Sequence, residues 1–189
     1  VIVAITGASG SVYGIELLRK LRNFPDIESH LVLSSAGALT AKAETDLGRS
    51  GIEKLADVAW SDKDLGASLA SGSFTTDSMF IAPCSMKSLA AIATGFTSTL
   101  VSRAADVVLK ERRRLILLVR EAPLHLVHLR NMTTVAQMGG IVFPPVPAFY
   151  TRPASVDDIV SQTVDRVLLV AGIESDTLKQ WQGVRRQTD

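Results

Sequence analysis

The sequence has a single cysteine, Cys84, among its 189 residues. One thiol excludes an internal disulfide and any metal site built from several cysteines, and it suits a reducing compartment. The sequence also lacks an apolar run of the roughly 20 residues that a membrane-spanning helix needs. Since the chain starts in a strand-like run without a basic leader pattern, we expect a cytoplasmic protein, or a mitochondrial matrix protein if a leader preceded Val1.

Neither sign of charge is in excess, because 20 Lys and Arg side chains oppose 19 Asp and Glu side chains. This balance gives no electrostatic reason to expect nucleic acid or an anionic membrane as a partner. Histidine is scarce as well. His125 and His128 could share one helix face, but no HExxH pattern or carboxylate cluster accompanies them, so we expect no metal site.

What the sequence does contain is an alternation of short apolar runs with amphipathic stretches. This alternation is typical of βαβ units and predicts a single α/β domain over residues 1–189, with a Rossmann-like parallel sheet, helices on both faces and a tail from about residue 180. The expected strands are Val1–Thr6, His30–Ser34, Met79–Ala82, Leu115–Val119 and Ile141–Phe143. The expected helices are Tyr13–Leu21, segments between about Ala36 and Asp57, Ser85–Ala93, Leu100–Glu111, Leu124–Met138 and a final helix capped by Ser155. The expected loops are Ser68–Ser78 and Pro144–Pro153.

Two turns between a strand and a helix could hold a ligand. Thr6–Gly10 contains two glycines, which let a ligand approach the backbone where a helix N-terminus favours an anion. The turn is neither a GxGxxG fingerprint nor a P-loop. Pro83–Ser88 is the second turn of this kind, and parallel sheets bind ligands beyond the carboxyl ends of their strands. A plain tight turn and a helix cap by Ser85 are the alternative interpretations.

Three sets of charged side chains could act on such a ligand. Arg103 and Lys110 are seven residues apart on one expected helix, so both can face a phosphate, unless they form only a solvated basic helix end. Arg120 and Glu121 follow a strand, where partial burial would raise the pKa of the carboxyl toward general-acid use. An Arg-Glu pair is also common as a structural feature, and Glu44 is equally ambiguous by itself.

Several segments, taken in order, carry a family resemblance. They are Gly7–Gly10, Glu44–Asp46, Ser71–Phe74, Pro83–Lys87, Arg103–Asp106, Leu109–Arg112, Arg120–Pro123 and Phe143–Tyr150. In this order and spacing, from Val1 to about Gly183, the chain resembles the UbiX-type flavin prenyltransferases, which have also been named phenylacrylic acid or 3-octaprenyl-4-hydroxybenzoate decarboxylases. The resemblance implies a flavodoxin-like fold and an FMN cofactor.

The resemblance also implies a role for individual residues. The matches to FMN contacts are Gly7, Ala8, Ser9, Ser34, Ser85, Met86, Lys87, Ser88 and Arg120. The matches to contacts of the dimethylallyl phosphate are Arg103, Lys110, Tyr150 and Arg166. The matches to catalytic positions are Ser9, Glu44, Lys110 and Glu121. Trp181 matches a carboxyl-terminal tryptophan near the site.

The implied reaction joins a dimethylallyl group from dimethylallyl (mono)phosphate to N5 and C6 of reduced FMN. The prenylated FMN would serve a partner UbiD-type decarboxylase that acts on an aromatic acid or a quinone precursor. Cationic side chains would stabilise the departing phosphate, and because the reduced flavin is the nucleophile, no serine or cysteine nucleophile is expected. The family also implies a homododecamer built from trimers, with each active site at a subunit boundary.

One departure from the family pattern concerns charge. The family usually has Ser-Lys after the second strand, whereas this chain has Ser34-Ser35. We expect the loss of this cation to alter the affinity for the flavin or for the phosphate.

Three other functions compete with the prenyltransferase interpretation. Flavoproteins of the same fold decarboxylate cysteine oxidatively, but they typically carry a Pro-x-Met-Asn motif, and here Pro83 is followed by Cys-Ser-Met-Lys. A decarboxylase acting directly on an aromatic acid would need a means to stabilise a ring carbanion, which the sequence does not offer. A flavin-storage protein would have no use for Glu44, Glu121, Lys110 and Arg166.

Overall fold

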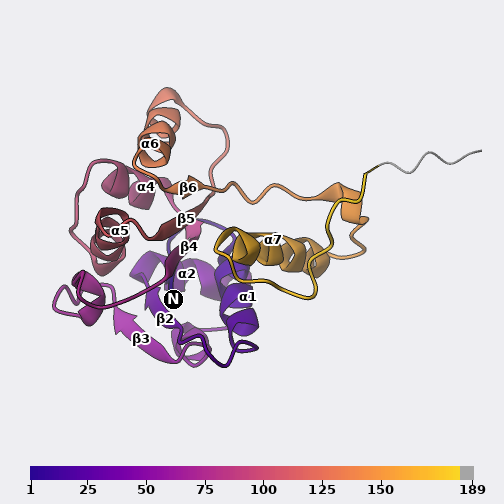
Figure 1. The fold of residues 1–189 in the computed structure, drawn as a ribbon, viewed down its shortest axis with the longest axis horizontal. Coiled ribbons are helices and arrows are strands. Elements are labelled where there is room, and N and C mark those ends of the chain that lie inside the picture. The colour runs from indigo at the N-terminus through magenta and orange to yellow at the C-terminus, as the bar shows by residue number, and fades with distance from the viewer. Residues whose placement is uncertain (184–189) are drawn as a thin grey trace, which may run out of the picture.

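One sheet of six parallel strands runs through the centre of the molecule (Figure 1). The computed structural model describes residues 1–183. The strands are β1 (Ile2–Ile5), β2 (His30–Leu33), β3 (Val58–Ser61), β4 (Ser78–Cys84), β5 (Arg114–Val119) and β6 (Ile141–Val142). Their order in the sheet is β3-β2-β1-β4-β5-β6. The predicted α/β fold with a parallel sheet is therefore confirmed.

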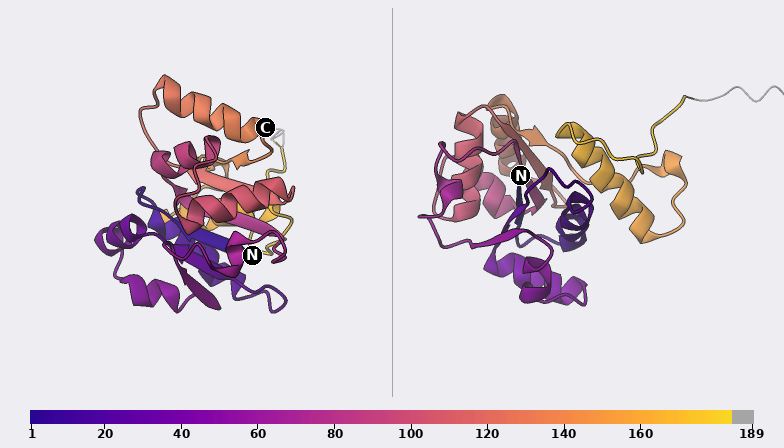
Figure 2. Two further views of the ribbon diagram at one scale, coloured as in Figure 1. Left: turned by 90° about the vertical axis from the view of Figure 1, so that its left-hand side faces the viewer. Right: turned by 60° about the horizontal axis from the view of Figure 1, so that its bottom comes forward.

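Both faces of the sheet are covered by helices, as two further views show (Figure 2). Ile2 and Ala4 of β1 point into one core cluster, and Val3 and Ile5 point into the other, as the two-residue period of a strand requires. The helices on the Val3 side are α1 (Ser11–Leu21), α2 (Ser35–Glu44), α3 (Arg49–Glu53) and α7 (Val156–Val170). Those on the Ile2 side are α4 (Met86–Ala93), α5 (Leu100–Lys110), α6 (Leu126–Gln137) and the 3-10 turn η1 (Ser68–Ala70). Burial on both faces explains why these strands read as short continuous apolar runs.

Hydroxyl side chains cap the helices that begin at the carboxyl edge of the sheet. The Ser34 hydroxyl accepts a hydrogen bond from the Gly37 amide at 2.9 Å, and the Ser85 hydroxyl accepts one from the Ser88 amide at 3.3 Å. Thr99 forms a reciprocal capping box at the start of α5. These caps fix where α2, α4 and α5 begin, so three helix N-termini lie at one edge of the sheet.

The packing of α1 on the sheet depends on a glycine. A Cβ atom at Gly14 would meet the carbonyl oxygen of Ala82 at 2.2 Å. Any larger residue would push α1 away from β4. The close approach places the start of α1 directly beside the end of β4.

The sequence prediction missed one strand. Residues Val58–Ser61 form β3 at the edge of the sheet, where its side chains alternate between half-buried and exposed. An edge strand of four residues has too few buried positions to give a clear apolar run.

The expected helical stretch before β3 is confirmed as α2 and α3, which are separate helices. The two expected loops contain only η1 and a second 3-10 turn, η2 (Phe149–Thr151). Of the expected tail, residues 184–189 lie outside the described part of the chain.

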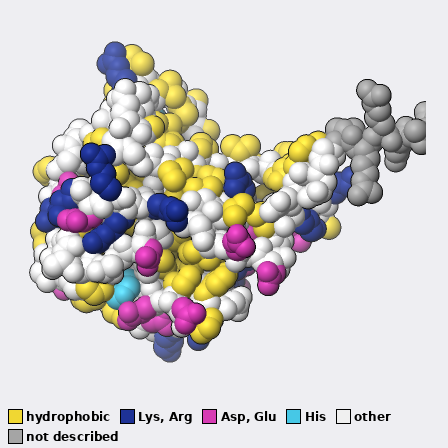
Figure 3. All heavy atoms as spheres, in the orientation of Figure 1, with side chains coloured by type: hydrophobic (Ala, Val, Ile, Leu, Met, Phe, Trp, Pro, Cys, Tyr) yellow, Lys and Arg dark blue, Asp and Glu magenta, His cyan; other side chains and the backbone are white. Residues whose placement is uncertain are grey.

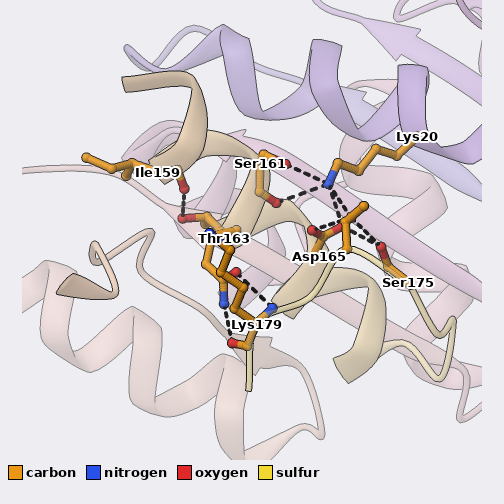
Figure 4. A network of polar contacts seen from close by, with 9 residues as sticks. Lys20, Ile159, Ser161, Thr163, Asp165, Ser175 and Lys179 are labelled. Carbon is orange, nitrogen blue, oxygen red and sulfur yellow. Dashed lines mark hydrogen bonds and ion pairs between the residues drawn. The ribbon is translucent and has the colours of Figure 1, made fainter. Parts of the chain in front are cut away.

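A buried ion pair ties the last described segment to the body of the protein (Figure 4). Asp165 of α7 is 1% exposed and accepts a hydrogen bond from the Lys20 ammonium of α1. The hydroxyls of Ser175 and Thr177 also donate to the Asp165 carboxylate, at 2.7 and 2.8 Å. One carboxylate thus joins α1, α7 and the segment that follows α7. Nearby, the buried Gln162 side chain donates to the Lys179 carbonyl oxygen at 2.8 Å.

We predict that Asp165→Asn lowers the free energy of unfolding by about 3 kcal/mol, because the variant leaves the Lys20 charge without its partner in a nearly dry site. Urea unfolding at fixed protein concentration measures this loss. Asp176→Asn is a matched control in the same segment, since Asp176 is exposed, and should change the free energy by less than about 0.5 kcal/mol. Equal effects of the two substitutions would contradict the role given to the ion pair.

Candidate active site

A cleft of about 1140 Å³ opens at the carboxyl ends of β1, β2, β3 and β4. Residues from both predicted turns line it, together with residues that follow β2 and β3 and the start of α5. The lining includes Thr6, Gly7, Ser34, Ser35, Arg49, Ser61, Asp62, Lys63, Ser85, Lys87, Ser88, Phe96, Thr99 and Ser102. The cleft therefore lies where the fold predicts a ligand crevice.

Thr6 holds the two turns together. Its hydroxyl donates to the Pro83 carbonyl oxygen at 2.7 Å and accepts from the Ser85 amide at 2.8 Å. Beside it, a Cβ atom at Gly7 would come within 2.5 Å of the Ala36 Cβ, so glycine is required there. The exposed backbone of Gly7 forms part of the cleft wall, where a ligand can approach it closely.

The turn after β4 presents small polar groups and one cation. Ser85, Lys87 and Ser88 all line the cleft, and the hydroxyls of Ser85 and Ser88 lie 3.1 Å apart. Met86 is the first residue of α4. The Cys84 thiol points into the core, where burial raises its pKa. Cys84 is therefore protonated and does not serve as a nucleophile.

Arg120 and Glu121 lie directly beside this turn. The Arg120 amide donates to the Cys84 carbonyl oxygen at 3.2 Å, which brings the end of β5 next to Ser85. Both side chains are exposed, and the Glu121 carboxylate accepts from the Ala122 amide at 3.0 Å. The main chain at the end of β5 thus lies beside the second turn, but the expectation that Glu121 is partly buried was wrong.

Glu44 reaches the start of α1 from the end of α2. Its carboxylate accepts hydrogen bonds from the Gly10 amide at 3.0 Å, the Ser11 amide at 3.0 Å and the Ser11 hydroxyl at 2.8 Å. Burial alone would raise the pKa of Glu44, but hydrogen bonds from Ser9, Ser11 and Gly10 outweigh it and hold the pKa below its usual value. In this arrangement Glu44 is a carboxylate that accepts hydrogen bonds from the first turn and anchors it.

The residues expected at the donor phosphate lie outside the cleft of the same chain. Arg103 donates to the Ala70 carbonyl oxygen at 3.1 Å and pairs with Asp106 at 2.7 Å. Lys110 pairs with Glu111 at the end of α5, about 15 Å along the helix from the end that lines the cleft.

Tyr150 and Arg166 do not line the cleft either. The Tyr150 ring packs edge-on against Trp181, with centroids 5.5 Å apart. The segment around η2 and the segment after α7, which carry these two rings, form an arm that projects beyond α7 in Figure 1. Arg166 is exposed on α7. Of the residues expected at the flavin, those that line the cleft are Gly7, Ser34, Ser85, Lys87 and Ser88, whereas Ala8, Ser9, Met86 and Arg120 are not part of the lining. The residues expected at the donor phosphate do not line the cleft of the same chain either.

Sequence reasoning missed several residues that line the cleft. Arg49 lies inside an expected helix and carries no local signal. Ser61, Asp62 and Lys63 were missed because β3 was missed. Thr99 and Ser102 could have been found from their capping pattern, since a hydroxyl three residues before another hydroxyl marks the start of α5.

Within residues 1–183, no group of three or more His, Cys, Asp and Glu side chains is placed to hold a metal ion. None of the helices described combines the length and the apolar character that a membrane crossing requires.

Comparison with known proteins agrees with this geometry. A profile of the Flavoprotein family matches residues 1–168. The chain is 52% identical over 184 residues to the flavin prenyltransferase UbiX of Escherichia coli K12, covering 96% of this chain and 97% of the relative. It belongs to the UbiX-type flavoproteins.

Two solved structures of this family match the whole fold. One, named AnUbiX (PadA1) in complex with FMN and dimethylallyl pyrophosphate, has a TM-score of 0.95 and 46% identity, with 97% of each chain covered. The other, a dodecameric FMN-dependent UbiX-like decarboxylase from Escherichia coli O157:H7, has a TM-score of 0.94 and 47% identity, with 96% of this chain and 98% of that chain covered. The family resemblance seen in the sequence is confirmed.

We predict that Glu44→Gln destabilises this UbiX-type protein by about 1 kcal/mol at neutral pH, because the start of α1 loses a charged acceptor. Since the pKa of Glu44 is lowered by folding, its contribution is present above the unfolded value of about 4.3 and is lost as the pH falls through the folded value. The gap between wild type and variant should therefore close on acidification. Thermal unfolding from about pH 7 to about pH 3 measures the gap, and a gap independent of pH would refute this role.

Proposed function

We propose that this protein is a flavin prenyltransferase that joins the dimethylallyl group of a dimethylallyl phosphate to N5 and C6 of reduced FMN. The observation that carries the proposal is the cleft, which unites both predicted turns and has Arg120 and Glu121 at its side. It occurs in a chain about half identical to a flavin prenyltransferase over nearly its full length.

The described residues fit an FMN cofactor. The cleft is large enough for a molecule of this size, and the cations Arg49, Lys63 and Lys87 outnumber the one lining carboxylate, Asp62. The Val101 amide already donates to that carboxylate at 3.1 Å. Backbone and hydroxyl groups would bind the cofactor, with Gly7, Ala8, Ser9 and Ser34 on one side and Ser85, Met86, Lys87, Ser88 and Arg120 on the other.

Bound reduced FMN supplies the nucleophile, so the protein needs to manage protons and the leaving phosphate. Glu121, which is exposed beside the Ser85 turn, would exchange a proton with the reacting groups. Glu44, together with Ser9 at the first turn, would be a second site of proton transfer. Lys110, Arg103, Tyr150 and Arg166 would stabilise the negative charge that develops on the departing phosphate.

We further propose that neighbouring subunits complete each active site, as in a homododecamer built from trimers. A similar protein is dodecameric, and in this chain the donor-phosphate residues lie away from the cleft. Large apolar side chains are exposed on and beside α6 and on the projecting arm (Figure 3). They include Leu126, Val127 and Leu129, which are 47–58% exposed, and Phe149 and Trp181, which are 70% and 57% exposed. Apolar patches of this kind mark contact surfaces.

The cofactor made here would be passed to a UbiD-type decarboxylase in the cytoplasm. The single buried thiol is consistent with that reducing compartment.

We predict that the purified protein, incubated anaerobically with reduced FMN and dimethylallyl monophosphate or diphosphate, yields a flavin heavier by one dimethylallyl unit. Glu121→Gln should slow its formation roughly 100-fold or more while FMN stays bound, because the variant loses a proton-transfer group rather than a cofactor contact. Mass spectrometry of the extracted flavin measures this, with the exposed Glu174→Gln as the control. Unchanged flavin with both donors, despite bound FMN, would leave a directly acting FMN-dependent decarboxylase as the better description.

We also predict that Lys110→Ala and Glu121→Gln subunits, each inactive alone, regain activity when they are co-expressed in one oligomer. Random mixing of shared sites should restore about a quarter of the wild-type rate, because a site that takes the two residues from different subunits can receive both intact. The control is a mixture of the two variant oligomers purified separately, which do not exchange subunits and should stay inactive. Failure of co-expressed oligomers to regain activity would show that one chain supplies both residues.

A further inference from the structure

Arg49 is a charged side chain of the cleft that neither the sequence motifs nor the family match assigns. It is the first residue of α3, and its guanidinium donates to the Leu33 carbonyl oxygen at 3.1 Å and to the Ser34 carbonyl oxygen at 3.3 Å. It therefore lies across the carboxyl end of β2, beside Ser34 and Ser35. Its position is fixed by the main chain of the strand that ends at the cleft.

The guanidinium keeps both charge and donors available for a ligand. Its partner Glu53 lies 3.2 Å away, but the two side chains are 42% and 36% exposed, so solvent screens the pair. An arginine has five N–H groups, and the contacts with Leu33, Ser34 and Glu53 occupy only part of that fork. The free part matches the geometry of a phosphate.

The order of the strands indicates which end of FMN meets Arg49. Glu121, the proposed proton-transfer group, follows β5, and Ser85 follows the neighbouring β4, so the reactive ring belongs at this end. From β5 to β2 there are three strand spacings, or about 14 Å. A ligand that is elongated, with its ring at β4 and β5, has its phosphate end near β2, where Arg49 and Ser35 line the cleft.

Building on the proposed function, we propose that Arg49 binds the FMN phosphate and makes the cleft select FMN over riboflavin. In this chain a guanidinium from α3 provides a fixed positive charge at a point where α2 itself begins with the uncharged pair Ser34 and Ser35. The assignment concerns cofactor recognition and is separate from the proton transfer proposed for Glu121, which follows β5.

The test compares the binding of oxidised FMN and riboflavin, which differ only in the phosphate, by quenching of flavin fluorescence. Arg49→Leu should weaken FMN binding by about 10- to 100-fold, the loss expected for one charge-assisted contact, and change riboflavin binding less than about twofold. The FMN affinity of the variant should also depend less on salt than that of the wild type. Arg22→Leu, on an exposed position after α1, is the control for net charge.

A second variant separates recognition from support of β2. Arg49→Gln keeps an amide that can donate to the main-chain carbonyls but carries no charge, so it should lose FMN affinity as Arg49→Leu does and again spare riboflavin. Equal losses for both flavins, or no loss for either, would overturn the assignment. Because no prenyl donor is present, the result stands apart from turnover: a chain that selects FMN through Arg49 but never prenylates it would refute the proposed function alone.

Discussion

The pairing of β1 with β4 is the constraint on which the rest of the structure depends. From β1 the chain moves to β2 and β3 on one side and then returns to β4, β5 and β6 on the other. The connections after β1 and β4 therefore leave in opposite directions, and a crevice opens between them. Thr6 spans this point, because its hydroxyl bonds to both Pro83 and Ser85 and its amide donates to the Pro83 carbonyl oxygen at 3.3 Å. One residue thus joins the two turns.

The elements that local physics determines could be predicted from the sequence. Strands buried on both faces appear as apolar runs, and Ser85, Thr99 and Ser155 cap helices as hydroxyls do. The Thr6–Gly10 turn could be predicted because its glycines mark it in the sequence, and at Gly7 a larger residue would clash with Ala36. The features that escaped prediction depend on residues far apart in the chain. Glu44 meets Ser11 across 33 positions, and Arg49 reaches the cleft only because α3 packs beside β2.

The strand β3 was not predicted from the sequence for a related reason. An edge strand is defined by its partner, here β2, and its own four residues are only half-buried. Once β3 is missed, the cleft residues after it cannot be placed. The position of the donor-phosphate residues relative to the cleft is harder still to predict, because these residues do not line the cleft of their own chain. Family resemblance could name Lys110 and Tyr150, but spacing along one chain could not bring them together.

The position of Cys84 has a consequence for the durability of the protein. Cys84 directly precedes Ser85, which lines the cleft, yet the Cys84 thiol is buried in the core, and burial keeps it protonated. Oxidants attack thiolates that solvent can reach, and a reduced flavin in air is a local source of such oxidants. The buried and protonated Cys84 thiol is therefore a poor target for such oxidants, although it lies next to the turn that lines the cleft.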